Sequence, residues 1–139
     1  MFRHLWIFLC LVGFMWVATA KGGSPEEVVR EYAKARLEVA RKGLADSEKD
    51  IGGGISYEGI WLWSQRVLES ELALCTTKIE RIAAWEAHLR RAAKLEKMAQ
   101  SEFSRGGFTR GGVLEAIYRR YDVEVQLAQE RSKPESLHR

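Results

Sequence analysis

Apolar residues between positions 25 and 49 recur at steps of three and four, the spacing of one face of an α-helix. Ser24 is placed to cap this segment, Pro25 suits the first helical position, and Glu27 completes a capping box. The pattern predicts a first helix from about Pro25 to a residue within Leu44–Lys49. The apolar stripe comprises Val28, Tyr32, Ala35, Val39 and Lys42, with Val29, Ala33, Arg36, Leu37 and Ala40 in the adjacent rows. The charged residues Arg30, Lys34, Arg41, Glu31 and Glu38 lie elsewhere on the helix.

Three consecutive glycines end the helical pattern. In Ile51-Gly52-Gly53-Gly54-Ile55 the backbone entropy of glycine opposes a helix, so we expect a loop. A phosphate-binding loop is the alternative, but no Gly-Lys-Ser/Thr follows and no predicted strand precedes. No alternating strand pattern occurs elsewhere, and we therefore expect an all-α protein.

A second helical pattern runs from about Ser56 to about Phe103, which is long for a single helix. Its apolar residues follow a heptad spacing that is typical of coiled-coil packing. Thr77-Lys78-Ile79-Glu80 matches the capping-box pattern, so we expect either a kink or a helix end and restart near Thr76–Lys78. The heptad seam comprises Leu68, Leu72, Cys75, Ile79 and Ile82, followed less regularly by Trp85, Leu89, Ala92, Leu95 and Ala99.

A glycine-rich turn between Arg105 and Gly112 precedes a final amphipathic helix. Gly106 is a suitable left-handed cap for the preceding helix, and Thr109 can cap the next one. One face of the final helix comprises Val113, Leu114, Ile117, Tyr121 and Val125, with Leu127 and Ala128. We therefore expect residues 25–132 to form an antiparallel helical hairpin or a three-to-four-helix bundle with coiled-coil-like packing.

The first twenty residues differ in character from the rest. A short basic start precedes an apolar run of 13 residues, Leu5–Val17, and then Ala18-Thr19-Ala20. This order is typical of a secretory signal peptide, and the run is shorter than the roughly 20 residues of a membrane-spanning helix. We expect residues 1–20 to be a cleaved signal or, alternatively, an uncleaved membrane anchor. Residues 21–24 would form a lead-in and 133–139 a polar tail, with the domain exported to the periplasm or cell envelope.

Composition and charge favour a folded protein without a nucleic-acid partner. Apolar residues make up 46% of the chain and charged residues 29%, and basic and acidic residues are interspersed, giving a net charge of +3. Arg90-Arg91 and Arg119-Arg120 are short basic pairs of the kind found on solvated helix faces. A membrane-surface or nucleic-acid binder that uses these pairs is a less favoured alternative.

No residue pattern points to catalysis, a cofactor or a metal. His88 is the only histidine of the helical region, and a di-iron bundle would need Glu-x-x-His pairs on facing helices, so we expect an exposed or packed histidine. Cys75, the single cysteine after a cleaved signal, is expected to be a small buried helix residue, with an inter-chain disulfide as the alternative. The sequence predicts a non-enzyme without catalytic, cofactor-binding or metal-ligating residues. An enzyme that works from scattered residues is the least favoured reading.

Aromatic and apolar residues of the second region are candidates for an interface. Trp61 and Trp63 lie two residues apart and therefore face nearly opposite sides of a helix. One can pack inward while the other stays more exposed and marks a contact site. The alternative is that both pack against the first helix. The candidate interface residues are Trp61, Trp63, Leu68, Leu72, Ile79 and Ile82.

The segment Phe103-Ser-Arg-Gly106-Gly-Phe-Thr109-Arg-Gly-Gly112-Val113-Leu114-Glu-Ala116 resembles the helical hairpins of the outer-membrane efflux (TolC) family. It departs from that family at Gly112, where the family prefers Asp. The residues to which the resemblance gives roles in the turn and in packing are Phe103, Gly106, Thr109, Val113, Leu114 and Ala116. Other stretches resemble a recurring type of small exported helical protein of planctomycete-like bacteria, namely Trp63–Leu68, Ile79–Ala84 and Glu86–Leu89.

These observations favour a non-enzymatic exported protein with a structural or protein-interaction role in the cell envelope. The apolar stripes on several helices exceed what one short bundle can bury, so we expect self-association or an envelope protein partner. Membrane contact is expected only through an uncleaved signal or a partner. The resemblance implies an alternative, a periplasmic hairpin component or docking partner of a TolC-like efflux or export system. The chain is not expected to form an efflux duct, which needs membrane strands and longer helices in two repeats.

Overall fold

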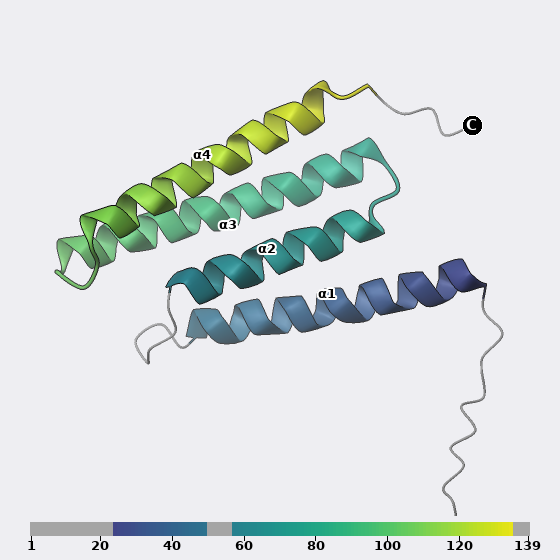
Figure 1. Ribbon diagram of the computed structural model, residues 1–139, viewed down its shortest axis with the longest axis horizontal. Helices are drawn as coiled ribbons and strands as arrows, with labels where there is room; N and C mark the ends of the chain where they lie inside the picture. Colours follow the sequence, from purple (N-terminus) through teal and green to yellow (C-terminus); the bar gives the residue numbers. More distant parts are fainter. Residues whose placement is uncertain (1–23, 50–56, 135–139) are drawn as a thin grey trace, which may run out of the picture.

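The computed structural model describes residues 24–49 and 57–134, which form four α-helices and no strand (Figure 1). The helices are α1 (Pro25–Lys49), α2 (Tyr57–Leu74), α3 (Lys78–Ser104) and α4 (Arg110–Ser132). The prediction of an all-α bundle of antiparallel helices is thereby confirmed. The expected signal peptide, most of the lead-in, the glycine loop and the end of the polar tail lie outside the described residues.

The helices form an open array instead of a closed ring. Consecutive helices run in opposite directions and pack side by side, α1 on α2, α2 on α3 and α3 on α4. Within the described part of the chain, the backbones of α1 and α4 do not approach each other, and Figure 1 places them at opposite edges. Each edge helix therefore has one side against a neighbouring helix and another side without one.

Two capping boxes begin helices where the sequence predicts them. The backbone N–H of Ser24 donates to the Glu27 carboxylate at 2.7 Å, and the Glu27 N–H donates to Ser24 Oγ at 3.3 Å. At the start of α3, the Glu80 N–H donates to Thr77 Oγ1 at 3.2 Å while the Glu80 carboxylate accepts from the Thr77 N–H at 3.1 Å. Since α2 ends at Leu74 and α3 begins at Lys78, the long helical pattern is interrupted by an end and a restart, not by a kink.

The turn between α3 and α4 uses the two cap residues that the sequence indicates. Gly106 has a φ of +78°, and its N–H donates to the Phe103 carbonyl at 3.0 Å. The Thr109 hydroxyl accepts from the Gly112 N–H at 3.1 Å and caps α4. A Cβ at Gly112 would collide with the ring of Phe108, which itself contacts the Tyr57 ring at 5.0 Å between centroids. The chain therefore has a steric reason for glycine at the position where the TolC family prefers Asp.

Only one edge of the apolar stripe that the sequence indicates on α1 is turned toward the array. Val28, Tyr32 and Val39 are exposed, and the side chains turned toward the array are buried or half-buried. The inward residues are Ala33, Leu37, Ala40, Leu44 and Ser47. These side chains are smaller on average, so the helix can approach its neighbour closely. The ring of Trp63 in α2 rests directly on Gly43, where a Cβ would come within 2.5 Å of it.

The predicted face of α4 is likewise buried only in part, since Leu127 is buried and Val113 and Ile117 are half-buried. Leu114, Tyr121 and Val125 are exposed. The buried side chains are Ala116, Val123, Leu127 and Glu130. Both edge helices thus carry two apolar stripes. In α1 the stripe with the smaller residues packs against the neighbouring helix, and in α4 the stripe that includes the charged residue Glu130 does so.

The predicted heptad seam does not form one surface. Leu68 in α2 is buried, whereas Ile79 at the start of α3 is exposed. Because the chain leaves the helical conformation at residues 75–77, the spacing on one side of the break does not continue on the other. Cys75 lies in this connection, half-buried, with its thiol donating to the Glu71 carbonyl at 3.1 Å, and so is not the buried helix residue that we expected.

The central core lies where α2, α3 and α4 meet. Its buried members are Ile60, Trp61, Ala92, Leu95 and Val123, with Leu44, Tyr57, Trp85, Leu89 and Met98 packed around them. This cluster fixes the positions of the inner helices α2 and α3. The edge helices are attached to it along one side only.

Substitution of Gly43 by alanine is expected to destabilise the protein by about 1–3 kcal/mol, because the new methyl group would push the Trp63 ring off α1. Gly111 is a matched control, since the nearest atom to a Cβ there is Thr109 Oγ1 at 3.9 Å. Alanine at Gly111 should be neutral or stabilising by up to about 1 kcal/mol. Urea denaturation of both variants measures the difference. Equal stabilisation by the two substitutions would contradict the packing of Trp63 on α1.

Candidate functional site

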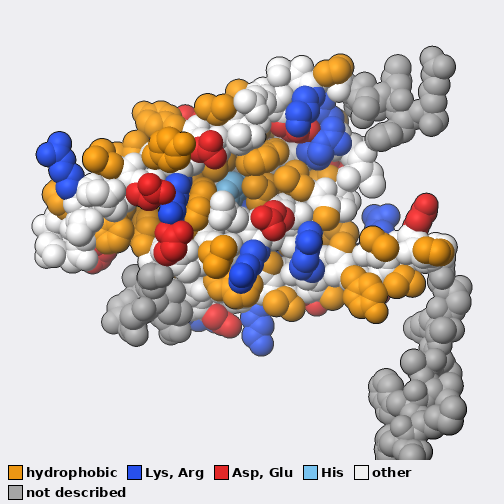
Figure 2. Space-filling view, viewed as in Figure 1, with side chains coloured by type: hydrophobic (Ala, Val, Ile, Leu, Met, Phe, Trp, Pro, Cys, Tyr) orange, Lys and Arg blue, Asp and Glu red, His pale blue; other side chains and the backbone are white. Residues whose placement is uncertain are grey.

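Among the described residues, more large apolar side chains are exposed than buried. Among the described residues, 12 apolar side chains are buried, and five of these are alanines, whereas 11 large apolar side chains are exposed. Figure 2 shows hydrophobic atoms at the surface between the charged side chains of the visible face. Scattered exposed apolar residues are ordinary, but contiguous exposed stripes mark interaction sites.

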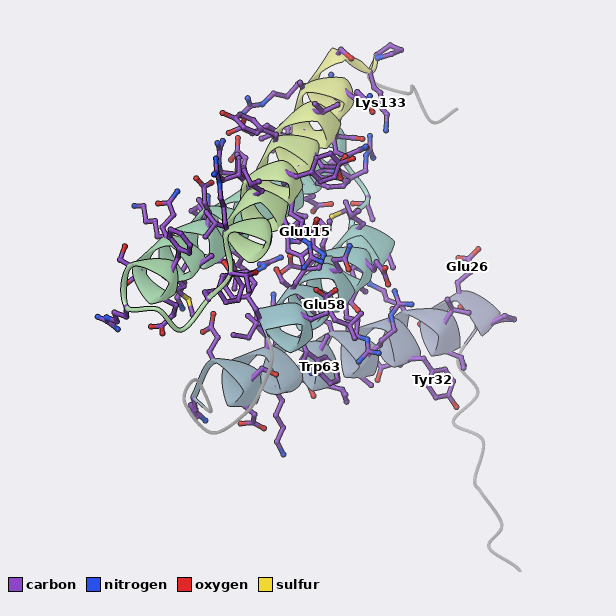
Figure 3. The ribbon with its side chains drawn as sticks, turned by 60° about the vertical axis from the view of Figure 1, so that its left-hand side comes forward. Glu26, Tyr32, Glu58, Trp63, Glu115 and Lys133 are labelled. Atoms are coloured by element: carbon purple, nitrogen blue, oxygen red, sulfur yellow. The ribbon has the colours of Figure 1, made fainter. Side chains whose placement is uncertain are left out.

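The α1 outer face consists of Val28, Tyr32, Ala35 and Val39, at steps of four, three and four. All four side chains are exposed, and Tyr32 is 73% exposed. In Figure 3 the labelled Tyr32 points away from the other helices. The spacing is that of a coiled-coil seam, so this face has the pattern of a helix that packs against a second helix.

The α4 outer face consists of Leu114, Tyr118, Tyr121 and Val125, at the same steps of four, three and four. Tyr118 is 68% exposed, and the guanidinium of Arg120 lies 4.1 Å from the centroid of the Tyr121 ring. Tyrosine and arginine are enriched at protein interfaces, where they supply apolar area together with a polar group. This face is therefore the more aromatic of the two.

Ion pairs hold the inner side of α4 against its neighbours. Arg119 donates to Glu58 of α2 and to Glu115 of α4, each at 2.7 Å, and its guanidinium lies 5.2 Å from the Trp61 ring. Figure 3 shows Glu58 and Glu115 close together between the two helices. Farther along α4, buried Glu130 accepts from Arg81 of α3 at 2.6 Å.

These partners fix the rotation of α4. The hydrogen bonds from Lys133 and from Arg81 lower the pKa of the Glu130 carboxyl. Arg120 is bound to Glu96 of α3 and, at 2.5 Å, to Glu124 of α4. Because the charged groups are used on the inner side, the outer stripe of α4 cannot turn inward without breaking them.

A buried polar cluster joins α2 to α3. Ser64 Oγ lies 3.0 Å from His88 Nδ1 and accepts from Arg91 Nε at 3.0 Å. The His88 ring lies between Trp61 and Trp85, at 5.1 and 6.3 Å between centroids.

This cluster has the residue types of a nucleophile and its base, but its burial assigns it a structural role. Ser64 is 0% exposed and His88 is 2% exposed, so a substrate cannot reach either group. Burial and the nearby Arg91 lower the pKa of His88 to about 4, which keeps the ring neutral near pH 7. The cluster extends through Arg91 to Glu71 at 3.7 Å and on to Arg41 of α1 at 3.0 Å. It therefore links three helices.

The candidate interface residues from the sequence do not form a common exposed surface. Trp61 and Leu68 are buried, Trp63, Leu72 and Ile82 are half-buried, and Ile79 is exposed. Trp61 faces α3 and α4 while Trp63 faces α1, in line with their spacing of two residues.

The candidate turn and packing residues are also divided between caps, core and surface. Gly106 and Thr109 act as caps, Ala116 is buried and Val113 is half-buried. Phe103 and Leu114 are exposed, so neither packs in the core. Sequence reasoning missed Tyr118 altogether. The signal that could have found it was its spacing, four residues after Leu114 and three before Tyr121, on the face that the sequence already indicated.

Two open grooves of about 370 and 390 Å³ lie beside the end of α2 and share Leu74 and Cys75 in their walls. Across residues 24–49 and 57–134, no three His, Cys, Asp or Glu side chains are grouped so that they could hold a metal ion. None of the helices in these ranges combines the length and the apolar character needed to cross a membrane.

Acidification is expected to destabilise the protein through His88. The pKa of this residue is about 4 in the folded state and about 6.5 when unfolded, so between these values the unfolded chain binds more protons. The stability due to neutral His88 is complete above pH 6.5 and is lost as the pH falls toward 4, by at most about 3 kcal/mol. Urea midpoints across this range test the effect. The His88→Gln variant should show a shallower pH dependence, and an unchanged slope would contradict the assignment.

Compared with known protein families, with curated proteins and with solved structures, the chain has no significant match.

Proposed function

We propose that this protein is a non-enzymatic, exported helical protein with a structural or protein-interaction role in the cell envelope. One observation carries the proposal. The two edge helices of the array each present an exposed apolar stripe at coiled-coil spacing, while their inner sides are already packed and paired. Such a protein acts by packing helix against helix.

Two further features support the separate parts of this proposal. The apolar run and the Ala18-Thr19-Ala20 sequence near the start of the chain support export. The Ser64–His88 pair, which has the residue types of a catalytic dyad, is enclosed between α2 and α3 and supports a non-enzymatic role.

Photo-cross-linking in the cells that make the protein tests the interaction role. A photo-activatable residue in place of Tyr118 or Tyr32 should give protein cross-links, because both side chains lie on the outer faces. The same residue in place of Lys97, which is exposed on α3, serves as the control. Similar yields at all three positions would refute an interaction role for the outer faces. A reporter fusion that stays in the cytoplasm would refute export.

A second candidate is a periplasmic hairpin that docks on, or belongs to, a TolC-like efflux or export system. The observation that favours it is the α3–α4 hairpin, in which exposed Phe103 and Leu114 flank the Gly106 turn. Apolar side chains beside a hairpin turn are suited to insertion between helices of a partner.

Substitution of Leu114 by aspartate tests this second role. The change places a charge on an exposed side chain beside the turn and should abolish co-purification of an export-system component while leaving the helices intact. Tyr32→Asp, on the opposite edge of the array, should leave that co-purification unchanged. Retention of the component by Leu114→Asp would count against docking through the hairpin.

A further inference from the structure

The four arginines of the two basic pairs have different roles in the structure. The guanidinium groups of Arg91, Arg119 and Arg120 each bind a side chain of another helix. Arg90 is exposed and makes no such contact within the described part of the chain. The two pairs therefore do not form a common basic surface, and Arg90 is the arginine whose guanidinium stays directed to solvent.

Arg90 begins a basic stripe along α3. Lys94 and Lys97 follow it at steps of four and three, which places the three side chains on one face of the helix. This α3 basic stripe borders an open hollow of about 530 Å³, a volume that is ordinary for a small-molecule site. The described residues that line the hollow include no carboxylate; they are Arg90, Ala93, Lys94, Lys97, Met98 and Ser101.

The charge of the α3 basic stripe is compensated only in part. Glu48 of α1 accepts from Lys94 at 2.9 Å, and the Lys94 side chain is still 57% exposed. Across residues 24–49 and 57–134, Arg90 and Lys97 have no ion-pair partner. Three cations against one carboxylate leave two positive charges at the hollow.

The α3 basic stripe does not stabilise its own helix. Like charges three and four residues apart repel each other on a helix surface. The stripe also ends before the last turn of α3, where basic residues would interact favourably with the helix dipole. Local helix stability therefore gives no reason for three cations at this spacing, whereas a bound anion would reverse their repulsion.

We propose that this hollow binds a phosphate group carried by a molecule with an apolar portion. A phosphomonoester has nearly two negative charges at pH 7 and presents three acceptor oxygens, which match the two uncompensated charges. The planar guanidinium of Arg90 can donate two parallel hydrogen bonds to such a group, while Lys94 and Lys97 act as point charges. A carboxylate, with one charge and two oxygens, is the poorer match.

The remaining side chains of the hollow suit the rest of such a ligand. The hydroxyl of Ser101 supplies a further hydrogen-bond donor beside the cations. Ala93 and half-buried Met98 give the hollow an apolar wall, against which a hydrocarbon portion would be removed from water. The shared chemistry is a phosphomonoester, which occurs in soluble compounds and in the headgroup of phosphatidic acid.

Titration of the purified protein with inorganic phosphate and with hexyl phosphate tests the proposal. Nuclear magnetic resonance should show shifts of the backbone amides of residues 90–101 with both probes. Hexyl phosphate should bind several-fold more tightly, because its chain contacts Met98 and Ala93. Added salt should weaken the binding of both probes, since the cations are exposed.

Two variants test the role of the unpaired cations. Arg90→Gln and Lys97→Gln should each weaken binding about tenfold, as expected for the loss of a hydrogen bond between charged groups. Both side chains are exposed, so circular dichroism should show unchanged helicity. Lys42→Gln removes the same charge from the exposed side of α1 and is the matched control, with unchanged affinity expected. Equal weakening by all three variants would indicate general charge attraction and overturn the site.

Vesicles of phosphatidylcholine with and without phosphatidic acid distinguish the two sources of the phosphate group. Co-sedimentation only with phosphatidic acid, and its loss in Arg90→Gln, would support the site and assign it to a lipid headgroup. Binding of hexyl phosphate without co-sedimentation would support the site and assign it to a soluble phosphomonoester.

Two results would overturn the phosphate site. One is the absence of shifts at residues 90–101 with both small probes. The other is tighter binding of an oligoglutamate peptide than of hexyl phosphate, which would indicate an acidic protein partner. Either result leaves the proposed role of the α1 and α4 outer faces to its own test, because Tyr32 and Tyr118 do not line the hollow.

Discussion

The buried contact between α2 and α3 is the constraint on which the rest of this structure depends. The chain consists of two helical hairpins, and this contact is where their backbones meet. Ser64, His88 and Arg91 are hydrogen-bonded there beside the Trp61 ring. Hydrogen bonds require a particular alignment, whereas apolar side chains can slide past one another. The polar cluster therefore sets the register of one hairpin on the other.

That register decides which surfaces stay exposed. Once α2 and α3 are aligned, Arg119 of α4 reaches Glu58 of α2, while Glu71 of α2 binds Arg41 of α1 within the first hairpin. These pairs hold the edge helices to the outer sides of the inner two, and the array does not close on itself. The outer faces of α1 and α4 are left at opposite edges with their apolar stripes directed outward. The proposed interaction role of the protein rests on these two exposed faces.

Local signals in the sequence predicted the local structure well. Ser24 with Glu27, Thr77 with Glu80, Gly106 and Thr109 each stabilise a helix end through atoms only a few residues away, so their roles can be identified without knowledge of the fold. The choice of buried face could not be identified in this way. For a helix with two apolar stripes, the spacing of apolar residues identifies both stripes. Which of the two is buried depends on the helix that packs against it. Gly43 lies beneath the Trp63 ring, and the small residues Ala33 and Ala40 share this inner side, whereas Tyr32 is exposed.

The sequence by itself determined the all-α class, the helix ends and the existence of more apolar stripes than one small bundle can bury, because these depend on residues close together in the chain. The tertiary structure alone decided that the array is open, that Leu114 and Tyr121 face outward, and that Ser64 meets His88 across two helices. Each of these depends on how far one helix has turned about its own axis against another. That rotation is set by side-chain shape and by ion pairs between distant residues, neither of which follows from spacing along the chain.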